Sequence, residues 1–145
     1  MRNKMAREPI GDIAPLDGNL EIDFTNLTKK PFSIYLHVPF CKKRCGYCDF
    51  NTYTPNELDT KDQIENWAKA IVKEIELSKS ILKKELEIDT IFFGGGTPSL
   101  LSGKEISYLF DSLKNNFDFS KNIEITLEAN PDDINDEIIE NWIKN

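Results

Sequence analysis

The sequence predicts an α/β fold with a parallel sheet, in which three consecutive β-α units form part of a larger (β/α) barrel. Three observations support this prediction. Short apolar runs typical of strands alternate with longer segments whose apolar residues recur at helical spacing. Such alternation implies parallel strands joined by right-handed crossovers. Each strand also runs into a loop containing Cys, Gly or Pro, and these loops carry the functional groups of barrel enzymes.

The chain divides into two unequal parts. Residues 1–31 are rich in Pro, Gly and Asp and show little apolar periodicity, so they are predicted to form an irregular leader. A short extended piece is predicted near residues 22–24. Residues 32–145 are predicted to be the N-terminal portion of a barrel domain, which is incomplete because the chain ends after the third unit.

The first unit is predicted to begin with a strand at residues 34–38, a β-rich run that Pro39 stops. The cysteine-containing loop follows at once. A long amphipathic helix is then predicted from Asp59 to Leu82, with Asp59 or Thr60 as its N-cap.

The second and third units repeat this order. Residues 90–93 are predicted to be a buried strand, residues 94–96 a glycine turn and residues 102–116 a helix. Residues 123–128 are predicted to be the third strand, and residues 135–144 the start of the third helix. As the last strand, the third would be an unpaired edge of the sheet.

Composition restricts the class of protein. Lys and Arg total 18 against 25 Asp and Glu, and the net charge of -7 disfavours binding to nucleic acid or anionic lipid. No apolar run approaches the roughly 18 residues of a membrane span, so no transmembrane segment is expected. The first seven residues are mildly basic but lack the apolar core of a signal peptide. We therefore expect a cytoplasmic protein.

The chain contains three cysteines, Cys41, Cys45 and Cys48, within eight residues. An odd number on one short loop favours reduced, metal-binding thiolates over disulfides. Three thiolates on an iron-sulfur cubane would leave one iron open to a small molecule. The alternative is a structural zinc site closed by His37, although a hydrogen-bonding role for this histidine is favoured. The basic residues 42–44 either offset the thiolate charge or form a solvated loop.

Two further loops are candidates for ligand contact. The glycines at 94–96 would let the backbone approach a ligand closely, although a tight turn explains them equally well. Glu128 ends an otherwise apolar strand, where an unpaired carboxylate would be costly. Its expected partner is the ammonium or ribose of a ligand, or a structural lysine. Pro131 follows shortly after.

The motifs CxxxCxxC, GGGTP and ExNP, together with the run Tyr35-Leu36-His37-Val38-Pro39-Phe40-Cys41, resemble the radical S-adenosylmethionine (SAM) family. The resemblance spans about residue 32 to the end, and it is strongest to the branch of oxygen-independent coproporphyrinogen III oxidases. It implies a 4Fe-4S cluster whose open iron binds SAM, and cleavage of a carbon-sulfur bond to give methionine and a 5'-deoxyadenosyl radical. By motif match, the cluster ligands would be Cys41, Cys45 and Cys48, and the residues around SAM would be Tyr35, Tyr47, Gly95, Gly96, Thr97 and Glu128.

Within this branch, Phe50 favours one group over another. The decarboxylating oxidases resemble this chain but carry a further cysteine two residues after the third ligand, where Phe50 stands here. The sequence therefore resembles the HemW group of haem chaperones, in which an enzymatic role is open. The resemblance implies SAM, haem or a porphyrin, and an electron donor protein as partners. Coproporphyrinogen III oxidation, a zinc-binding structural module and a nonfunctional fragment are the alternatives.

Overall fold

The computed structural model describes residues 31–57, 63–82 and 86–144. The elements in chain order are β1 (Phe32–Val38), α2 (Gln63–Leu82), β2 (Glu87–Gly95), the 3-10 turn η1 (Pro98–Leu100), α3 (Gly103–Asn116), β3 (Asp118–Leu127), the 3-10 turn η2 (Pro131–Asp133) and α4 (Asp136–Ile143). The predicted leader up to residue 30 and the predicted N-caps Asp59 and Thr60 lie outside the described residues. The helix itself is confirmed from Gln63 onward.

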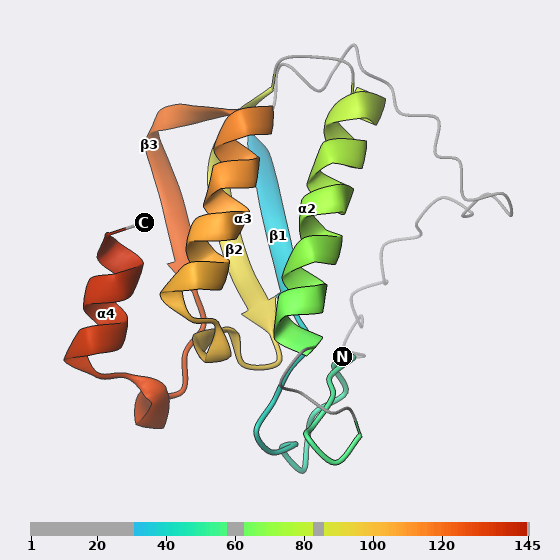
Figure 1. Cartoon of the computed structure of the whole chain (residues 1–145), viewed down its shortest axis with the longest axis vertical. Coiled ribbons are helices and arrows are strands. Elements are labelled where there is room, and N and C mark those ends of the chain that lie inside the picture. Colours follow the sequence, from blue (N-terminus) through green and yellow to red (C-terminus); the bar gives the residue numbers. More distant parts are fainter. Residues whose placement is uncertain (1–30, 58–62, 83–85, 145) are drawn as a thin grey trace, which may run out of the picture.

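The three strands form one open parallel sheet in the order β1-β2-β3, which confirms the predicted α/β fold. Leu36 pairs with Phe93, which in turn pairs with Leu127, so the carboxyl ends of all three strands meet at one edge. Helices α2 and α3 pack across one face of the sheet, and α4 contacts α3 (Figure 1). The loops that follow the strands therefore gather at one end of the molecule.

The core lies between the sheet and α2 and α3. At the end of β1, Leu36 and Val38 face the helices, because successive side chains of a strand point to opposite faces. The side chains that are almost fully buried include Val38, Ile88, Ile91, Phe93, Leu109 and Leu113. The opposite face carries Tyr35, which is 56% exposed, and Phe92, which is 37% exposed, so no element of the described chain covers it.

Local signals set the helix starts. The Ser102 side chain accepts a hydrogen bond from the amide of Lys104 while the Glu105 carboxylate accepts one from the amide of Ser102, which forms a capping box at α3. At α4, the Asn135 side chain accepts from the amide of Ile138. These caps place both helices immediately after the loops that follow β2 and β3.

All three strands are longer than predicted, and β1 begins at Phe32 instead of residue 34. β2 runs from Glu87 to Gly95, so Gly94 and Gly95 belong to the strand and only Gly96 lies in the turn. β3 begins at Asp118, and its pairing with β2 shifts register between Ile88 and Thr90. The polar segment at residues 120–122 hides the early start of β3, since it reads as a turn in the sequence.

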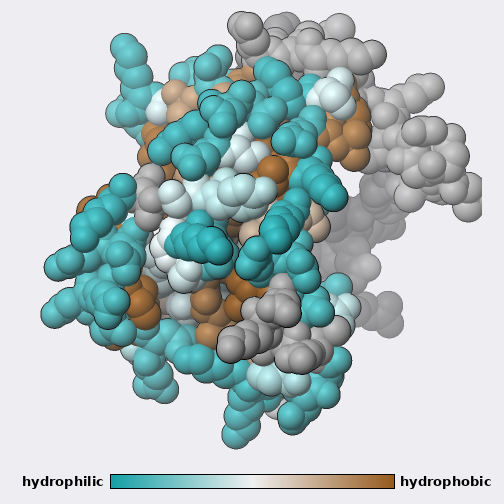
Figure 2. All heavy atoms as spheres, in the orientation of Figure 1, coloured by the Kyte–Doolittle hydropathy of each residue, from teal (hydrophilic) through white to brown (hydrophobic). Residues whose placement is uncertain are grey.

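No helix of the described chain is long and apolar enough to cross a membrane. Hydrophilic side chains cover much of the helical side of the molecule, with apolar atoms showing between them (Figure 2).

Candidate functional site

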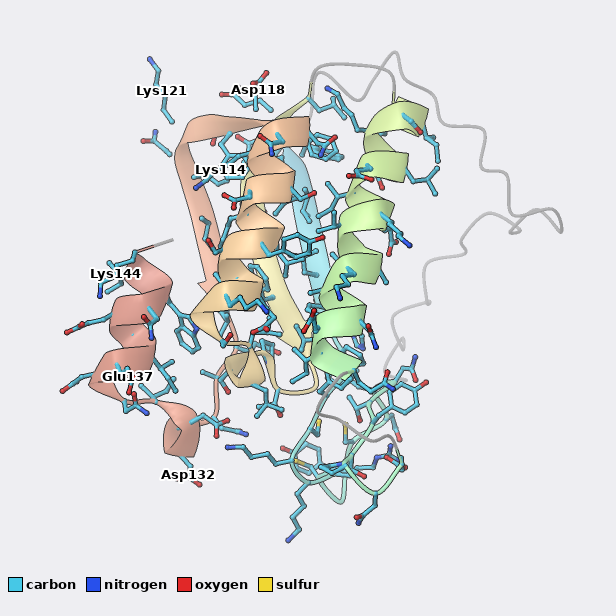
Figure 3. All side chains as sticks on the ribbon, in the orientation of Figure 1. Lys114, Asp118, Lys121, Asp132, Glu137 and Lys144 are labelled. Atoms are coloured by element: carbon cyan, nitrogen blue, oxygen red, sulfur yellow. The ribbon has the colours of Figure 1, made fainter. Side chains whose placement is uncertain are left out.

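The candidate site is built from the loops after β1, β2 and β3. Figure 3 shows sulfur atoms on the loop below the carboxyl ends of the strands, which is where the first of these loops lies. The other two loops begin at Gly96 and Glu128. The parallel sheet thus brings together three motifs that begin at Cys41, Gly94 and Glu128 in the sequence.

The glycine turn after β2 packs directly on the chain leading to the first cysteine. The Gly96 amide donates to the Val38 carbonyl and the Thr97 amide donates to the Phe40 carbonyl, both at 2.7 Å. A Cβ on Gly96 would lie 2.6 Å from the Phe40 oxygen and 2.9 Å from Sγ of Cys41. Glycine is therefore required here because the cysteine segment approaches so closely.

Gly95 is constrained in a second way. Its φ of 110° lies in the left-handed region, which glycine adopts without strain. A Cβ at this position would also lie 2.7 Å from the ring of His37. The amides of Gly96 and Thr97 thus donate hydrogen bonds to the segment that leads to Cys41. That Gly95, Gly96 and Thr97 contact a ligand stays a prediction.

The cysteine loop is closed at its base by backbone pairing. The Cys41 amide donates to the Tyr53 carbonyl at 3.0 Å, and the Tyr53 amide donates to Pro39 at 2.7 Å. Within the loop, the Cys48 amide donates to the Cys45 carbonyl at 3.2 Å. The two ends of the loop are therefore fixed to each other at Cys41 and Tyr53.

The three thiols differ in their surroundings. Cys41 is buried, Cys45 is exposed and Cys48 is partly exposed, and all three are free. Among the described residues, the structure does not gather them into a set that could ligate a metal ion. The donor set nevertheless suits an iron-sulfur cluster, because cysteine thiolates are the usual ligands of such clusters and all three lie on one short loop. The first of them, Cys41, lies against Gly96.

The basic residues of the loop are largely paired with carboxylates. Arg44 donates to Glu57 at 3.0 Å and also to the Thr52 carbonyl. The Thr54 amide and hydroxyl hold the pKa of Glu57 below its ordinary value, and the charge of Arg44 adds to this effect. Lys42 pairs with Asp133. Two of the three cations predicted to offset the thiolates thus have carboxylate partners.

Both ring nitrogens of His37 have hydrogen-bond partners. Nε2 lies 2.9 Å from the Asn51 carbonyl, which can only accept, so Nε2 carries the proton. In the neutral ring Nδ1 then accepts from the Tyr35 hydroxyl at 3.0 Å. The predicted hydrogen-bonding role is confirmed. In this arrangement neither nitrogen offers a free lone pair to zinc.

The two predicted tyrosines lie in different places. Tyr35 is on the uncovered face of β1, with its ring stacked near Phe92 at a centroid distance of 6.1 Å. Tyr47 lies on the cysteine loop and is 89% exposed. The structure therefore brings Tyr35 next to His37 but leaves Tyr47 apart from it.

Glu128 corrects one expectation. Its backbone amide donates to the Phe93 carbonyl at 3.1 Å, one residue beyond the end of β3. Its side chain is exposed, so its carboxylate needs no partner to offset burial. The argument from burial was wrong because the strand lies at the open edge of the sheet.

Sequence reasoning missed Asp133, the only acidic residue that is buried in the described chain. Its Oδ1 accepts from Lys42 and its Oδ2 accepts from the Ser99 hydroxyl at 2.9 Å. The hydrogen bond from Lys42 lowers the pKa of Asp133, and the bond from Ser99 acts in the same direction, while burial opposes both. Only their shared position after parallel strands could have suggested this pairing.

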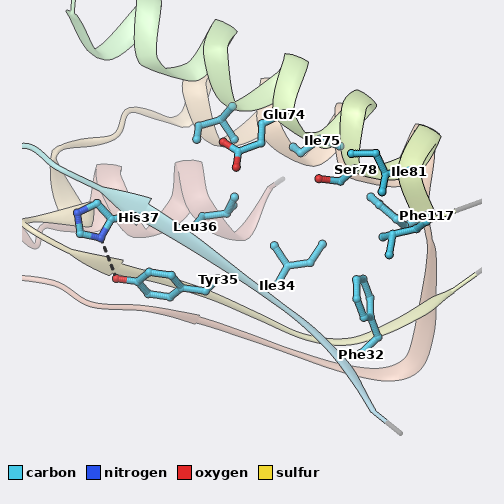
Figure 4. Close-up of a pocket in the computed structure, with 12 residues that line it drawn as sticks. Phe32, Ile34, Tyr35, Leu36, His37, Glu74, Ile75, Ser78, Ile81 and Phe117 are labelled. Atoms are coloured by element: carbon cyan, nitrogen blue, oxygen red, sulfur yellow. Dashed lines mark hydrogen bonds between the residues drawn. The ribbon is translucent and has the colours of Figure 1, made fainter. Parts of the chain in front are cut away.

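One cavity lies away from the cysteines. It measures about 450 Å³ and lies between β1 and α2, where it is lined mainly by apolar side chains (Figure 4). Phe32 and Phe117 lie at one end and His37 at the other. No residue of the cysteine loop lines it, although the predicted site residue Tyr35 does.

The described chain combines a parallel sheet, three cysteines after its first strand and a glycine turn held against the first of them. Residues 35–145 match the family model of the radical SAM superfamily. The chain belongs to this superfamily.

Individual relatives are haem-related proteins. The chain is 45% identical over 103 residues to the heme chaperone HemW of Mycobacterium tuberculosis and 36% identical over 102 residues to HemW of Escherichia coli. It is 32% identical over 117 residues to the oxygen-independent coproporphyrinogen III oxidase of Synechocystis. These matches cover 71%, 70% and 81% of the chain.

A solved structure has the same fold. Coproporphyrinogen III oxidase (HemN) from Escherichia coli, described as a radical SAM enzyme, matches 88% of the chain with a TM-score of 0.74 and 26% identity. The match covers 29% of that protein, and the HemW relatives above are each matched over 26% of their length. The chain thus spans about a quarter of the length of the relatives it matches.

Proposed function

We propose that this chain is the cluster-binding part of a HemW-type haem chaperone. Cys41, Cys45 and Cys48 would hold a 4Fe-4S cluster, and the open coordination position would bind SAM. The observation that carries this proposal is the contact between Gly96 and Cys41, because it joins the glycine turn to the first cluster ligand. The HemW relatives support the haem-related role.

The residues of the chain would orient and enclose these groups. When bound, the cluster and SAM supply one-electron cleavage of a carbon-sulfur bond. The Glu128 carboxylate, exposed beside the end of β2, is free to accept hydrogen bonds from polar groups of SAM. Tyr35 lies on the uncovered face of the sheet, and Tyr47 is available on the exposed part of the cysteine loop. An electron donor protein and haem or a porphyrin complete the proposed set of partners.

The decisive experiment is anaerobic reconstitution with iron and sulfide, followed by electron paramagnetic resonance of the reduced protein with and without SAM. A cluster signal that shifts on addition of SAM is the expected result. A colourless sample without iron would overturn the proposal. Titration with haem, followed by its Soret absorption, tests the chaperone role in the same sample.

Coproporphyrinogen III oxidation is the second candidate, favoured by the match to HemN and by the Synechocystis relative. Loss of carbon dioxide from coproporphyrinogen III, followed by mass spectrometry, distinguishes it. Phe50, where the decarboxylating enzymes are expected to carry a cysteine, leads us to expect no decarboxylation.

A further inference from the structure

The buried carboxylate of Asp133 connects all three loops of the site. Asp133 lies in η2, after β3, and its side chain is only 5% exposed. One oxygen accepts from Lys42 on the loop after β1, and the other accepts from Ser99 on the loop after β2. The Ser99 hydroxyl in turn accepts from the backbone amide of Asn130 at 3.3 Å. A single acid therefore bridges segments that are up to 91 residues apart in the sequence.

Each partner of Asp133 is close in sequence to a residue of the proposed site. Lys42 directly follows Cys41, Ser99 lies two residues after Thr97, and Asn130 lies two residues after Glu128. Backbone hydrogen bonds already join the glycine turn to the cysteine segment. The loop after β3 is joined to its neighbours by the backbone hydrogen bond from Glu128 to Phe93 and by the side chains of Ser99 and Asp133.

We propose that Asp133 is a positioning residue, which sets the cysteine loop and the Glu128 loop relative to each other through Lys42 and Ser99. A buried charge is costly unless it is fully paired, so the carboxylate strongly favours the one arrangement that satisfies both oxygens. Removing one partner leaves a buried group unpaired and releases the loop to which that partner belongs. The consequence for SAM binding rests on the proposed function, but the effect on the cysteine loop does not.

The first test needs no cluster. In the full chain without metal, iodoacetamide labels the thiols, and trypsin then separates Cys41 from Cys45 and Cys48 by cleaving in the basic run between them. Lys42→Met and Asp133→Asn are expected to raise the labelling rate of the buried Cys41 about tenfold relative to Cys45, the factor for a local opening made easier by one charge-assisted hydrogen bond. Asp132→Asn is the matched control, because Asp132 is exposed at the surface before α4 (Figure 3).

The second test uses the protein reconstituted with iron and sulfide. Ser99→Ala keeps the Lys42 contact but removes the link to Asn130. It is expected to leave the labelling of Cys41 unchanged, to weaken SAM binding about tenfold and to reduce the SAM-dependent shift of the resonance signal. Asp133→Asn should show both effects, faster labelling of Cys41 and weaker binding of SAM. Circular dichroism establishes that each variant folds. If Asp133→Asn does not fold, Lys42→Met replaces it in the test.

The outcomes separate this inference from the proposed function. If the unsubstituted chain takes up no cluster, the proposed function fails while the labelling of Cys41 still decides the role of Asp133. If the chain binds cluster and SAM but Lys42→Met and Asp133→Asn label Cys41 at the rate of Asp132→Asn, the positioning role is wrong and the proposed function stands.

Discussion

A β-carbon on Gly96 would lie 2.9 Å from Sγ of Cys41, closer than non-bonded atoms of these types pack. The glycine turn and the first proposed cluster ligand therefore share one packed contact, although they lie on different loops. Because this contact involves atoms of the folded chain alone, its energetic role can be measured before any cofactor is added.

Gly96→Ala is expected to destabilise the protein by about 1–3 kcal/mol, because the new methyl group must displace the Phe40 carbonyl and the Cys41 thiol. Urea denaturation measures this change in the free energy of unfolding. Gly46→Ala is the control, since nothing lies within 4 Å of a Cβ at that position. Equal stability of the two variants would show that the turn can accommodate the extra methyl group without loss of stability.

Cys45→Ala is expected to abolish cluster assembly, since two thiolates cannot hold a cubane firmly. Iron and acid-labile sulfide contents after anaerobic reconstitution measure the loss. Lys43→Ala, an exposed change on the same loop, should retain both. Full iron and sulfide in the Cys45 variant would remove this residue from the ligand set.

Glu128→Ala is expected to leave the cluster intact and to weaken SAM binding, because it removes an exposed carboxylate beside the end of β2. Equilibrium binding to the reconstituted protein gives the affinity. Glu124→Ala is a matched control on β3, where the carboxylate accepts a hydrogen bond from Thr126 instead. An unchanged affinity in the Glu128 variant would mean that this carboxylate does not contact SAM.

Protonation of Asp133 is expected to reduce stability in acid. Its folded-state pKa lies below the ordinary value of 3.8, so its stabilising contribution is fully present at higher pH and is lost as the pH falls through the folded-state pKa. Below about pH 4 the stability of the unsubstituted protein should therefore fall more steeply than that of Asp133→Asn. Urea denaturation at several pH values between about 3 and 6, the range in which carboxyl groups titrate, measures how the free energy of unfolding depends on pH in both proteins. Parallel curves for the two proteins would contradict the expectation.

Local patterns in the sequence determined the order and type of the elements. Apolar periodicity predicted α2 and α3, and the β-rich runs predicted all three strands, because these signals depend on near neighbours in the chain. Family membership also followed from short motifs, since the three cysteines and the GGGTP run each lie within a few neighbouring residues. The start of β3 was missed because the residues there are polar.

Contacts between distant residues were decided only by the tertiary structure. The run Gly94-Gly95-Gly96 suggested either a close approach to a ligand or a tight turn, and only the fold shows that Gly96 also packs against Cys41. The exposure of the Glu128 side chain was not expected from the apolar strand that precedes it. The pairing of Lys42 with Asp133 joins residues 91 apart, and it arises because parallel strands deliver their loops to a common edge. Sequence periodicity specifies each strand, whereas the packing of the sheet determines which loops meet.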